Sequence, residues 1–281
     1  MVSNKQEKIA VITGAGGTLC SEMARSLAGQ GMKVALLGRD IEKLKIVEHQ
    51  IKSAGGTAIS VSADVANLEA VEKARNIIVK ELGFCNILIN GAGGNQTQAV
   101  ATINEFDPKE LEEPSEGFRG FFNLDMPLFK NVIEVNTMGT VIPCQVFGKD
   151  MAENGGGSIV NIASLNSYRP LSRVAAYAMA KAGIANFTQW LAAYLAPANI
   201  RVNAIAPGFF LNDRSQKLLM TEDGGYTDRG AGIIRQTPMK HFGVAPELIG
   251  CLNWLIDDAS AGFVTGIVVP VDGGFLANAG I

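Results

Sequence analysis

Several residue types that define whole classes of protein are scarce in this sequence. Its 281 residues include two histidines and four cysteines, and the cysteines are far apart with no CxxC pair. A structural zinc site needs closely spaced cysteine and histidine ligands. We therefore expect no metal site, reduced thiols and a cytoplasmic location. The cysteines are Cys20, Cys85, Cys144 and Cys251.

Basic tracts and long apolar runs are also missing. The net charge is −3 and the isoelectric point about 5.5, so no nucleic-acid partner is expected. The apolar run Ile9–Thr13 is too short for a signal peptide or a membrane span. What remains is an ordinary globular composition, in a chain long enough to bury a large core. The expected partner is a small molecule.

Short strand-like runs alternate with helix-length stretches. The runs are apolar and rich in valine and isoleucine, which is typical of parallel strands buried on both faces. Repeated strand–helix–strand units predict one α/β domain over 1–281, a Rossmann-type doubly wound parallel sheet flanked by helices on both faces. The predicted strands are Ile9–Thr13, Lys33–Gly38, Thr57–Ser62, Ile87–Asn90, Ser158–Ala163, Arg201–Ile205 and Ile267–Pro270. The predicted helices include Leu19–Gln30, Lys43–Ala54 and Val174–Leu195.

Two stretches are longer than ordinary connections. Residues 95–130 are polar and aromatic, and residues 211–242 mix glycine, charge and scattered apolar side chains. Long segments of this kind inside a compact domain are usually functional or mobile, so both are predicted to be insertions. We expect the second to close over a substrate as a lid, although its glycines also fit an inert surface loop.

The first predicted strand runs into a glycine-rich turn and then a helix. Gly14, Gly16 and Gly17 let the backbone approach a pyrophosphate, and the helix that starts near Thr18 and Leu19 offers free N–H groups and a positive dipole end. Such turns are common, so the position directly after the first strand carries the argument. The turn predicts a dinucleotide phosphate site.

The second strand ends at Gly38, followed by Arg39 and Asp40. Here an acidic residue would bind the ribose 2′-hydroxyl of NAD, or a basic residue the 2′-phosphate of NADP. Arg39 favours NADP(H), and NAD(H) stays the alternative because Asp40 would repel a phosphate. Arg39 could instead stack on adenine or remain solvated.

Further candidate cofactor contacts follow the third and fourth strands. Asp64, with Val65 after it, is placed to accept a hydrogen bond from the adenine amino group, or else caps the next helix. Small residues after the fourth strand would let the backbone pass close to the cofactor, or serve packing only. They follow one another as Asn90, Gly91, Ala92 and Gly93.

A possible catalytic set lies further along the chain. Ser164 comes just past the strand Ser158–Ala163, where open α/β sheets place ligands. Tyr177 and Lys181 share one face of the long predicted helix. A protonated lysine lowers the pKa of a nearby phenol from about 10, which makes it a better acid–base group, and Ser164 can hold the substrate oxygen. A YxxxK pair is common by chance. The prediction of a catalytic set therefore depends on finding the pair together with Ser164 and the glycine-rich first turn.

In the order of its motifs the chain resembles the short-chain dehydrogenase/reductase family over essentially its whole length. The matching motifs are Thr13-Gly14 with its following glycines, Asn90-Gly91-Ala92-Gly93, Asn136, Ser164, Tyr177-Ala178-Met179-Ala180-Lys181, Pro207-Gly208 and Val271-Asp272-Gly273-Gly274. The resemblance implies hydride transfer between a nicotinamide dinucleotide and a carbonyl or alcohol.

The resemblance also implies a role for each site residue. Tyr177 would be the acid–base group, Ser164 would polarise the carbonyl, and Lys181 would contact the nicotinamide ribose and lower the tyrosine pKa. Asn136 would hold a water that links Lys181 to solvent, and Pro207-Gly208 would shape the nicotinamide pocket. Taken alone, Asn136 fits an amide inside a helix, and Pro207-Gly208 fits an ordinary turn.

The chain departs from the family pattern at two places. The later glycines of the first turn are replaced by Thr18 and Cys20, so glycine does not guarantee close helix packing. Asn90-Gly91 stands where paired asparagines are usual. Both departures put cofactor affinity in doubt and leave the proton chemistry untouched.

The loop after Ser164 and the inserted segment 95–130 resemble a sugar-acid branch of the family, the D-mannonate oxidoreductases or fructuronate reductases. A sugar acid needs a cation for its carboxylate and polar groups for its hydroxyls. Arg169 and Arg173 are the candidate cations and Asn166 a candidate hydroxyl ligand. Either arginine could instead be a surface or interface residue.

Alternative functions remain at this point. A 3-oxoacyl carrier-protein reductase would need a basic patch for its acidic carrier, which the acidic pI disfavours, and a polyol or gluconate dehydrogenase would share the site. A non-catalytic redox sensor would be expected to lose Ser164, Tyr177 or Lys181. The family commonly forms homotetramers through helices like Val174–Leu195 and the last strand, so a tetramer is expected.

Overall fold

The computed structural model describes residues 8–112 and 117–278. Within this part of the chain seven parallel strands form one sheet in the order β3-β2-β1-β4-β5-β6-β7. The strand order reverses between β1 and β4, which makes the sheet doubly wound as predicted. The single domain predicted over 1–281 includes residues 1–7, 113–116 and 279–281, which lie outside the described residues.

The boundaries agree closely with those expected from the apolar runs. The strands are β1 (Ile9–Thr13), β2 (Lys33–Gly38), β3 (Thr57–Ser62), β4 (Ile87–Asn90), β5 (Gly157–Ile162), β6 (Ile200–Pro207) and β7 (Val268–Val271). The helices are α1 (Thr18–Gly29), α2 (Ile41–Ser53), α3 (Leu68–Glu81), α4 (Met126–Glu153), α5 (Ala175–Leu195), α6 (Asp213–Leu219), α7 (Asp228–Gln236), α8 (Ile249–Ile256) and α9 (Asp258–Ala261). No helix in the described part of the chain is long and apolar enough to cross a membrane.

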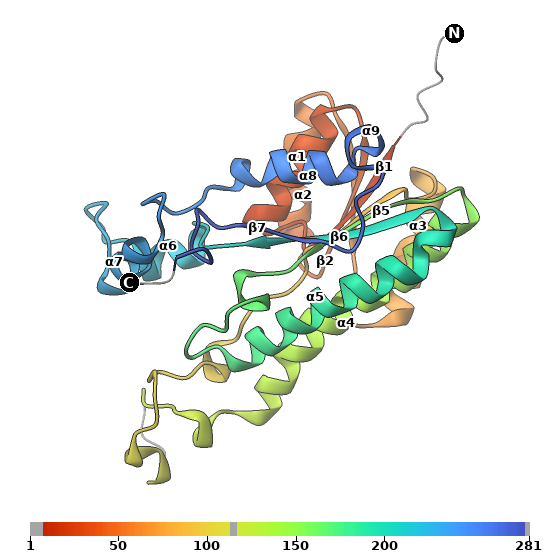
Figure 1. Ribbon diagram of the computed structural model, residues 1–281. Coiled ribbons are helices and arrows are strands. Elements are labelled where there is room, and N and C mark those ends of the chain that lie inside the picture. The colour runs from red at the N-terminus through yellow and green to blue at the C-terminus, as the bar shows by residue number, and fades with distance from the viewer. Residues whose placement is uncertain (1–7, 113–116, 279–281) are drawn as a thin grey trace.

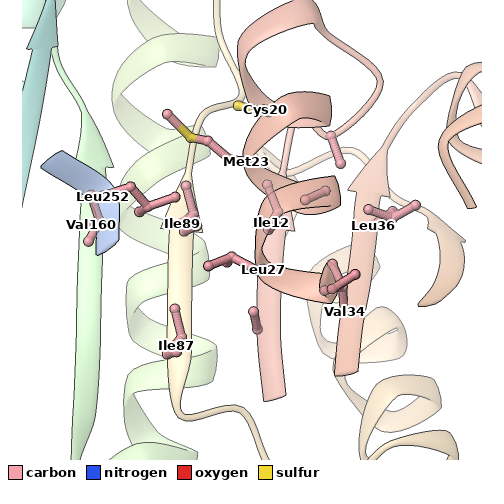
Figure 2. Close-up of a cluster of buried hydrophobic side chains, with 14 of the residues drawn as sticks. Ile12, Cys20, Met23, Leu27, Val34, Leu36, Ile87, Ile89, Val160 and Leu252 are labelled. Atoms are coloured by element: carbon pink, nitrogen blue, oxygen red, sulfur yellow. The ribbon is translucent and has the colours of Figure 1, made fainter. Parts of the chain in front are cut away.

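Helices cover both faces of the sheet (Figure 1). Alternate strand residues point to opposite faces, so Ile12 packs under α1, α2 and α8, whereas Val11 packs against α3, α4 and α5. Figure 2 shows the first of these clusters, in which Met23 and Leu27 of α1 lie over Ile12 and Ile89. Because both faces of the central strands are buried, β1 and β4 are buried throughout, which explains the apolar runs that predicted them.

The parallel arrangement brings the carboxyl ends of all the strands to one edge. The turns that follow β1, β2, β3 and β4 therefore lie beside the loops that follow β5 and β6. Residues far apart in the sequence, such as Gly14 and Ser164, reach the same edge. Ligands of doubly wound sheets bind in the crevice at this edge, near the reversal of strand order.

The two long segments lie beyond this edge. Short 3-10 turns occupy 97–99, 108–111 and 121–123, and Met126 then begins α4, so the end of the predicted insertion 95–130 belongs to a helix. Residues 113–116 of that insertion lie outside the described residues. The segment 211–242 is not a plain loop, because it contains α6 and α7. Both segments project from the body of the fold (Figure 1).

Candidate active site

The turn after β1 is shaped for a backbone approach. Gly14 has φ +68°, and a Cβ there would lie 2.8 Å from Ala92 Cα. Gly16 is also crowded, since its Cβ would lie 3.0 Å from Lys43 Cβ. Gly17 is the N-cap of α1 and supplies no side-chain cap, so the amides of the first turn, from Thr18 onward, keep their N–H groups available. This end of α1, with Leu19 in its first turn, fits a pyrophosphate.

Thr13 joins the ends of β1 and β4. Its Oγ1 accepts hydrogen bonds of 3.1 Å from the amides of both Gly91 and Ala92. The two strand ends that border the expected cofactor crevice are thus held at a fixed separation. From the sequence, Thr13 is recognisable only as part of a motif, because nothing local in the sequence indicates this long-range contact.

Cys20 and Gly91 form a pair of matched sizes. Cys20 is buried, and a Cβ placed on Gly91 would lie 2.1 Å from its Sγ. The Cys20 side chain on α1 is therefore accommodated by the absence of a side chain at Gly91, after β4. The two departures noted in the sequence compensate each other, and the close approach of α1 to β4 is preserved.

This pairing makes a stability prediction. Gly91→Ala should lower the free energy of unfolding by about 1–3 kcal/mol, because the added methyl overlaps Cys20 Sγ in a packed interior. Cys20→Ala in the same chain should restore most of the loss. Urea denaturation of the two single variants and the double variant gives the coupling. Additive losses would contradict the pairing.

The polar residues after β2 and β3, where the adenosine of the cofactor is expected to bind, are exposed to solvent. Arg39 is exposed, whereas Asp40 accepts a 3.2 Å hydrogen bond from Lys43 N at the start of α2 and lies 3.7 Å from Lys43 Nζ. The Asp40 carboxylate is thus partly neutralised, which weakens the repulsion expected from it. Asp64 accepts from Ala66 N at 3.0 Å.

The alternative role considered for Asp64 is filled by another residue. Asn67, not Asp64, caps α3, since its Oδ1 accepts from Ala70 N at 3.0 Å. Asp64 is exposed, and its neighbour Val65 is buried against Gly139 of α4. The adenine contact predicted for Asp64 and Val65 remains a prediction.

Ser164 is held by its neighbour Asn166. Ser164 Oγ accepts hydrogen bonds from Asn166 N at 3.2 Å and Asn166 Nδ2 at 3.3 Å. With two donors on its oxygen, the serine hydroxyl directs its own proton elsewhere. Asn166 Oδ1 accepts from Leu171 N at 3.0 Å, and the side chain is buried. Asn166 therefore supports the serine, which differs from the substrate contact predicted for it, because its polar atoms are used within the loop.

Tyr177 stands beside Ser164 in a partly buried position on α5. Burial raises the pKa of its phenol, and a hydrogen bond with Ser164 lowers it, with a net shift upward. This direction is opposite to the one predicted from sequence. The reason is burial of the phenol; the Lys181 Nζ, which lies 5.5 Å from the centre of the tyrosine ring, donates to Ile162 O at 2.7 Å. In this state the phenol holds its proton firmly.

Lys181 is the buried cation of the site. Burial lowers the pKa of its ammonium group from 10.5 to about 8, and the nearby Cys20 opposes this shift. Burial also raises the pKa of the Cys20 thiol to about 12, so the thiol stays neutral. Lys181 thus remains largely protonated near pH 7 but close to its titration point.

The Lys181 shift predicts a pH-dependent stability. Between about pH 8 and pH 10.5 the Lys181 amine binds more protons in the unfolded chain than in the folded one, so the contribution of this group to the free energy of unfolding rises with pH across the window. The rise is on the order of 3 kcal/mol. Urea denaturation without cofactor should show it as a difference between the pH dependence of the natural chain and that of Lys181→Met, because the other titrating groups, the buried cysteines included, are common to both proteins. Equal pH slopes in the two proteins would refute this assignment.

Asn136 fixes the backbone beside Lys181. Its Nδ2 donates to Gly94 O at 2.8 Å and Val132 O at 2.7 Å, and its Oδ1 accepts from Gly94 N at 3.1 Å. A Cβ on Gly93, which has φ +154°, would lie 2.4 Å from Asn136 Oδ1. The amide therefore holds the loop after β4. The water predicted at Asn136 remains a prediction.

Two other predicted cofactor motifs have structural contacts of their own. Asn90 turns its side chain into the interior, where Nδ2 donates to Asn161 Oδ1 at 2.9 Å. Only the backbone of Asn90, together with that of Gly91, therefore lies at the sheet edge. Pro207 ends β6, and Gly208 N donates to Val271 O at 2.9 Å. A Cβ on Gly208 would lie 2.6 Å from Asp272 Cα, so close packing requires glycine here.

A cavity of about 620 Å³ lies beside the loop that joins β5 to α5 and carries Ser164, which we call the catalytic loop. Arg169 and Arg173, the two candidate cations, both line it, and Asn166 does not. The cavity size suits a small ligand. Its other lining residues are Asn104, Pro170, Leu171, Ser172, Phe209, Asp228, Arg229, Gly232, Ile233, Gln236 and Phe275. Asn104 and Arg229 were missed in the sequence because they come from the two distant inserted segments.

Known proteins resemble this chain in both sequence and structure. The family model described as short chain dehydrogenase matches residues 8–223. An uncharacterized oxidoreductase, UxuB, of Bacillus subtilis is 46% identical over 278 residues, 99% of this chain and 98% of its own. A crystal structure of a candidate D-mannonate oxidoreductase from Haemophilus influenzae, with bound NAD, has a TM-score of 0.92 at 43% identity and 98% coverage of both chains. The 2-dehydro-3-deoxy-D-gluconate 5-dehydrogenase of Escherichia coli is 31% identical, with 96% of each chain covered.

Proposed function

The chain belongs to the short-chain dehydrogenase family and is an NAD(P)-dependent oxidoreductase, and we propose that its substrate is a sugar acid, with D-mannonate and D-fructuronate as the reacting pair. The observation that carries this proposal is the cavity beside the catalytic loop, into which Arg169 and Arg173 bring two cations. A guanidinium binds a carboxylate through paired hydrogen bonds, which suits an aldonate or uronate.

The residues at the sheet edge fit a nicotinamide dinucleotide. Gly14 leaves room for the backbone approach, and the uncapped N-terminus of α1 offers amides to the pyrophosphate. When bound, the dinucleotide supplies or accepts the hydride of the reaction. Lys181, in the first half of α5, is proposed to contact the nicotinamide ribose, and Asn136 is proposed to hold the water that connects Lys181 with solvent.

Ser164 and Tyr177 perform the proton chemistry in this proposal. During ketone reduction, Ser164 donates its hydroxyl hydrogen bond to the carbonyl oxygen, because Asn166 occupies the serine oxygen from behind. Tyr177 then gives its proton to the same oxygen as the alcohol forms. Its raised pKa keeps the phenol protonated beforehand. Lys181, as an ammonium group, stabilises the phenolate that remains.

A substrate screen tests the proposal. The absorbance change of the nicotinamide would be followed with D-fructuronate, D-mannonate, D-gluconate, neutral polyols and 3-oxoacyl thioesters, each with both cofactors. We expect turnover with D-fructuronate and D-mannonate to exceed that with neutral polyols by at least about a hundredfold in kcat/KM. Preference for polyols or acyl thioesters would replace the sugar-acid assignment with one of those rival functions.

NADP(H) is the proposed preferred cofactor, and NAD(H) is expected to serve as well. The support is the exposed Arg39 after Gly38, with Asp40 engaged at α2. The Haemophilus structure holds NAD. Arg39→Ser should raise KM for NADPH roughly tenfold or more, through loss of a charge-assisted bond, and leave KM for NADH nearly unchanged. Equal effects on the two cofactors would remove Arg39 from this role.

Three further proposals concern the segment 211–242, the oligomeric state and the cellular location of the protein. The segment 211–242 is proposed to act as a lid, because its helix α7 lines the cavity. A homotetramer is proposed on the exposed stack of Trp190 and Tyr194 on α5, which sedimentation would test. A cytoplasmic location is proposed because the four cysteines are free.

A further inference from the structure

Two arginines that line the cavity stand where local structure disfavours them. Arg173 has φ +78°, a left-handed backbone that a long side chain rarely adopts. Arg229 lies in the first turn of α7, where the helix dipole disfavours a cation. Both come from segments that flank the same cavity. Strained or unfavourable local arrangements of this kind are found mainly at functional sites, where the geometry is needed to bind a ligand.

The strained conformation of Arg173 is imposed by the inserted segment before α4. Ala101 N donates to Arg173 O at 2.9 Å, and Arg173 Nε donates to Asn104 Oδ1 at 2.7 Å. These two contacts fix the backbone and the direction of the guanidinium. The terminal nitrogens of Arg173 make no hydrogen bond with the described residues, so they are available to an anion.

Arg229 is available in the same way. It forms no hydrogen bond or ion pair with any residue that the structure describes, although Asp228 precedes it and also lines the cavity. Phe209 and Phe275, packed edge to face at 5.2 Å, line the same cavity and provide an apolar wall. An apolar wall strengthens the attraction between a guanidinium and a carboxylate by excluding water.

We propose that Arg173 and Arg229 form a two-sided clamp for the carboxylate of the substrate, with Asn104 as the positioning residue that aims Arg173. The inference rests on the proposed sugar-acid function and adds residues to it. In D-fructuronate the ketone and the carboxylate stand near opposite ends of the carbon chain. The carboxylate can therefore occupy the cavity while the ketone lies at Ser164 and Tyr177, and binding of the carboxylate draws α7 onto the substrate.

The clamp is tested with Arg229→Gln and a matched control, Arg235→Gln. Arg235 lies in the last turn of the same helix and does not line the cavity. For Arg229→Gln we expect KM for D-fructuronate to rise roughly tenfold to a hundredfold, with kcat nearly unchanged and neutral polyols unaffected. Arg229→Lys should give an intermediate KM, since the charge remains without the paired geometry. Arg235→Gln should behave like the natural chain.

A binding measurement separates failure of the clamp from failure of the proposed function. In thermal unfolding of the cofactor-bound protein, D-mannonate should raise the melting temperature of the natural chain and of Arg235→Gln. The shift should be largely lost in Arg229→Gln and reduced in Asn104→Ala. If the natural chain and Arg229→Gln respond equally, the clamp is wrong and the sugar-acid function stands. If the natural chain responds to no sugar acid in either assay, both are wrong.

Discussion

Tyr177→Phe should lower kcat by about a thousandfold or more while leaving the affinity for the dinucleotide nearly unchanged. The phenol is the group proposed to pass a proton to the substrate oxygen, and general acid–base catalysis of this kind contributes roughly 10²–10⁴ in rate. The ring itself remains in the variant, so the packing of α5 around it is kept. Steady-state kinetics with D-fructuronate and a fluorescence titration with NADPH measure the two quantities.

Two further variants define what the tyrosine result means. Ser164→Ala should also lower kcat strongly, because its hydroxyl contacts both the substrate oxygen and Tyr177 in the proposal. Asn166→Ala should have a smaller effect on kcat, since it acts only by orienting Ser164. Retained turnover in Tyr177→Phe would remove the tyrosine from the chemistry.

Arg173→Gly should raise KM for a sugar acid by roughly a hundredfold without making the protein less stable. The side chain lost is the one proposed to bind the carboxylate, and a charge-assisted pair of hydrogen bonds is worth this much in affinity. Glycine, however, adopts the φ of +78° without penalty, which offsets the lost contact with Asn104. A weaker affinity for the sugar acid together with an undiminished free energy of unfolding distinguishes a binding residue from a structural one.

The stability and kinetic measurements are made on the same preparation. Urea denaturation should give a midpoint equal to or above that of the natural chain, and kinetics with a neutral polyol should be unchanged. Arg173→Ala serves as the control, since alanine removes the same side chain but keeps most of the backbone strain. A similar rise in KM for both the sugar acid and the polyol would contradict carboxylate binding.

The fold could be predicted from sequence because its signals are local. The central strands are short apolar runs, and a parallel sheet buried on both faces requires this pattern. The conjunction of Ser164, Tyr177 and Lys181 was visible for the same reason, since strand ends and helix spacing fix where these residues lie. Parallel strands then bring all their carboxyl ends to one edge, so the site follows from the topology.

The remaining features depend on contacts between distant segments. The direction of the Tyr177 pKa shift depends on burial outweighing the hydrogen bond with Ser164, and this balance cannot be read from a YxxxK spacing. The compensation between Cys20 and Gly91 joins a helix start to a strand end. Arg229 is separated from Arg173 by a large part of the chain, and only the folded protein brings both to one cavity.

The most direct test of hydride transfer to a sugar acid uses deuterium. The protein would be incubated with D-fructuronate and NADPH or NADH carrying deuterium at C4 of the nicotinamide, each prepared in both C4 configurations, and the product examined by mass spectrometry. We predict D-mannonate that carries one deuterium with one of the two configurations, formed about a thousandfold or more slowly by Tyr177→Phe. Failure to form D-mannonate, or formation of unlabelled D-mannonate with both configurations, would contradict the account.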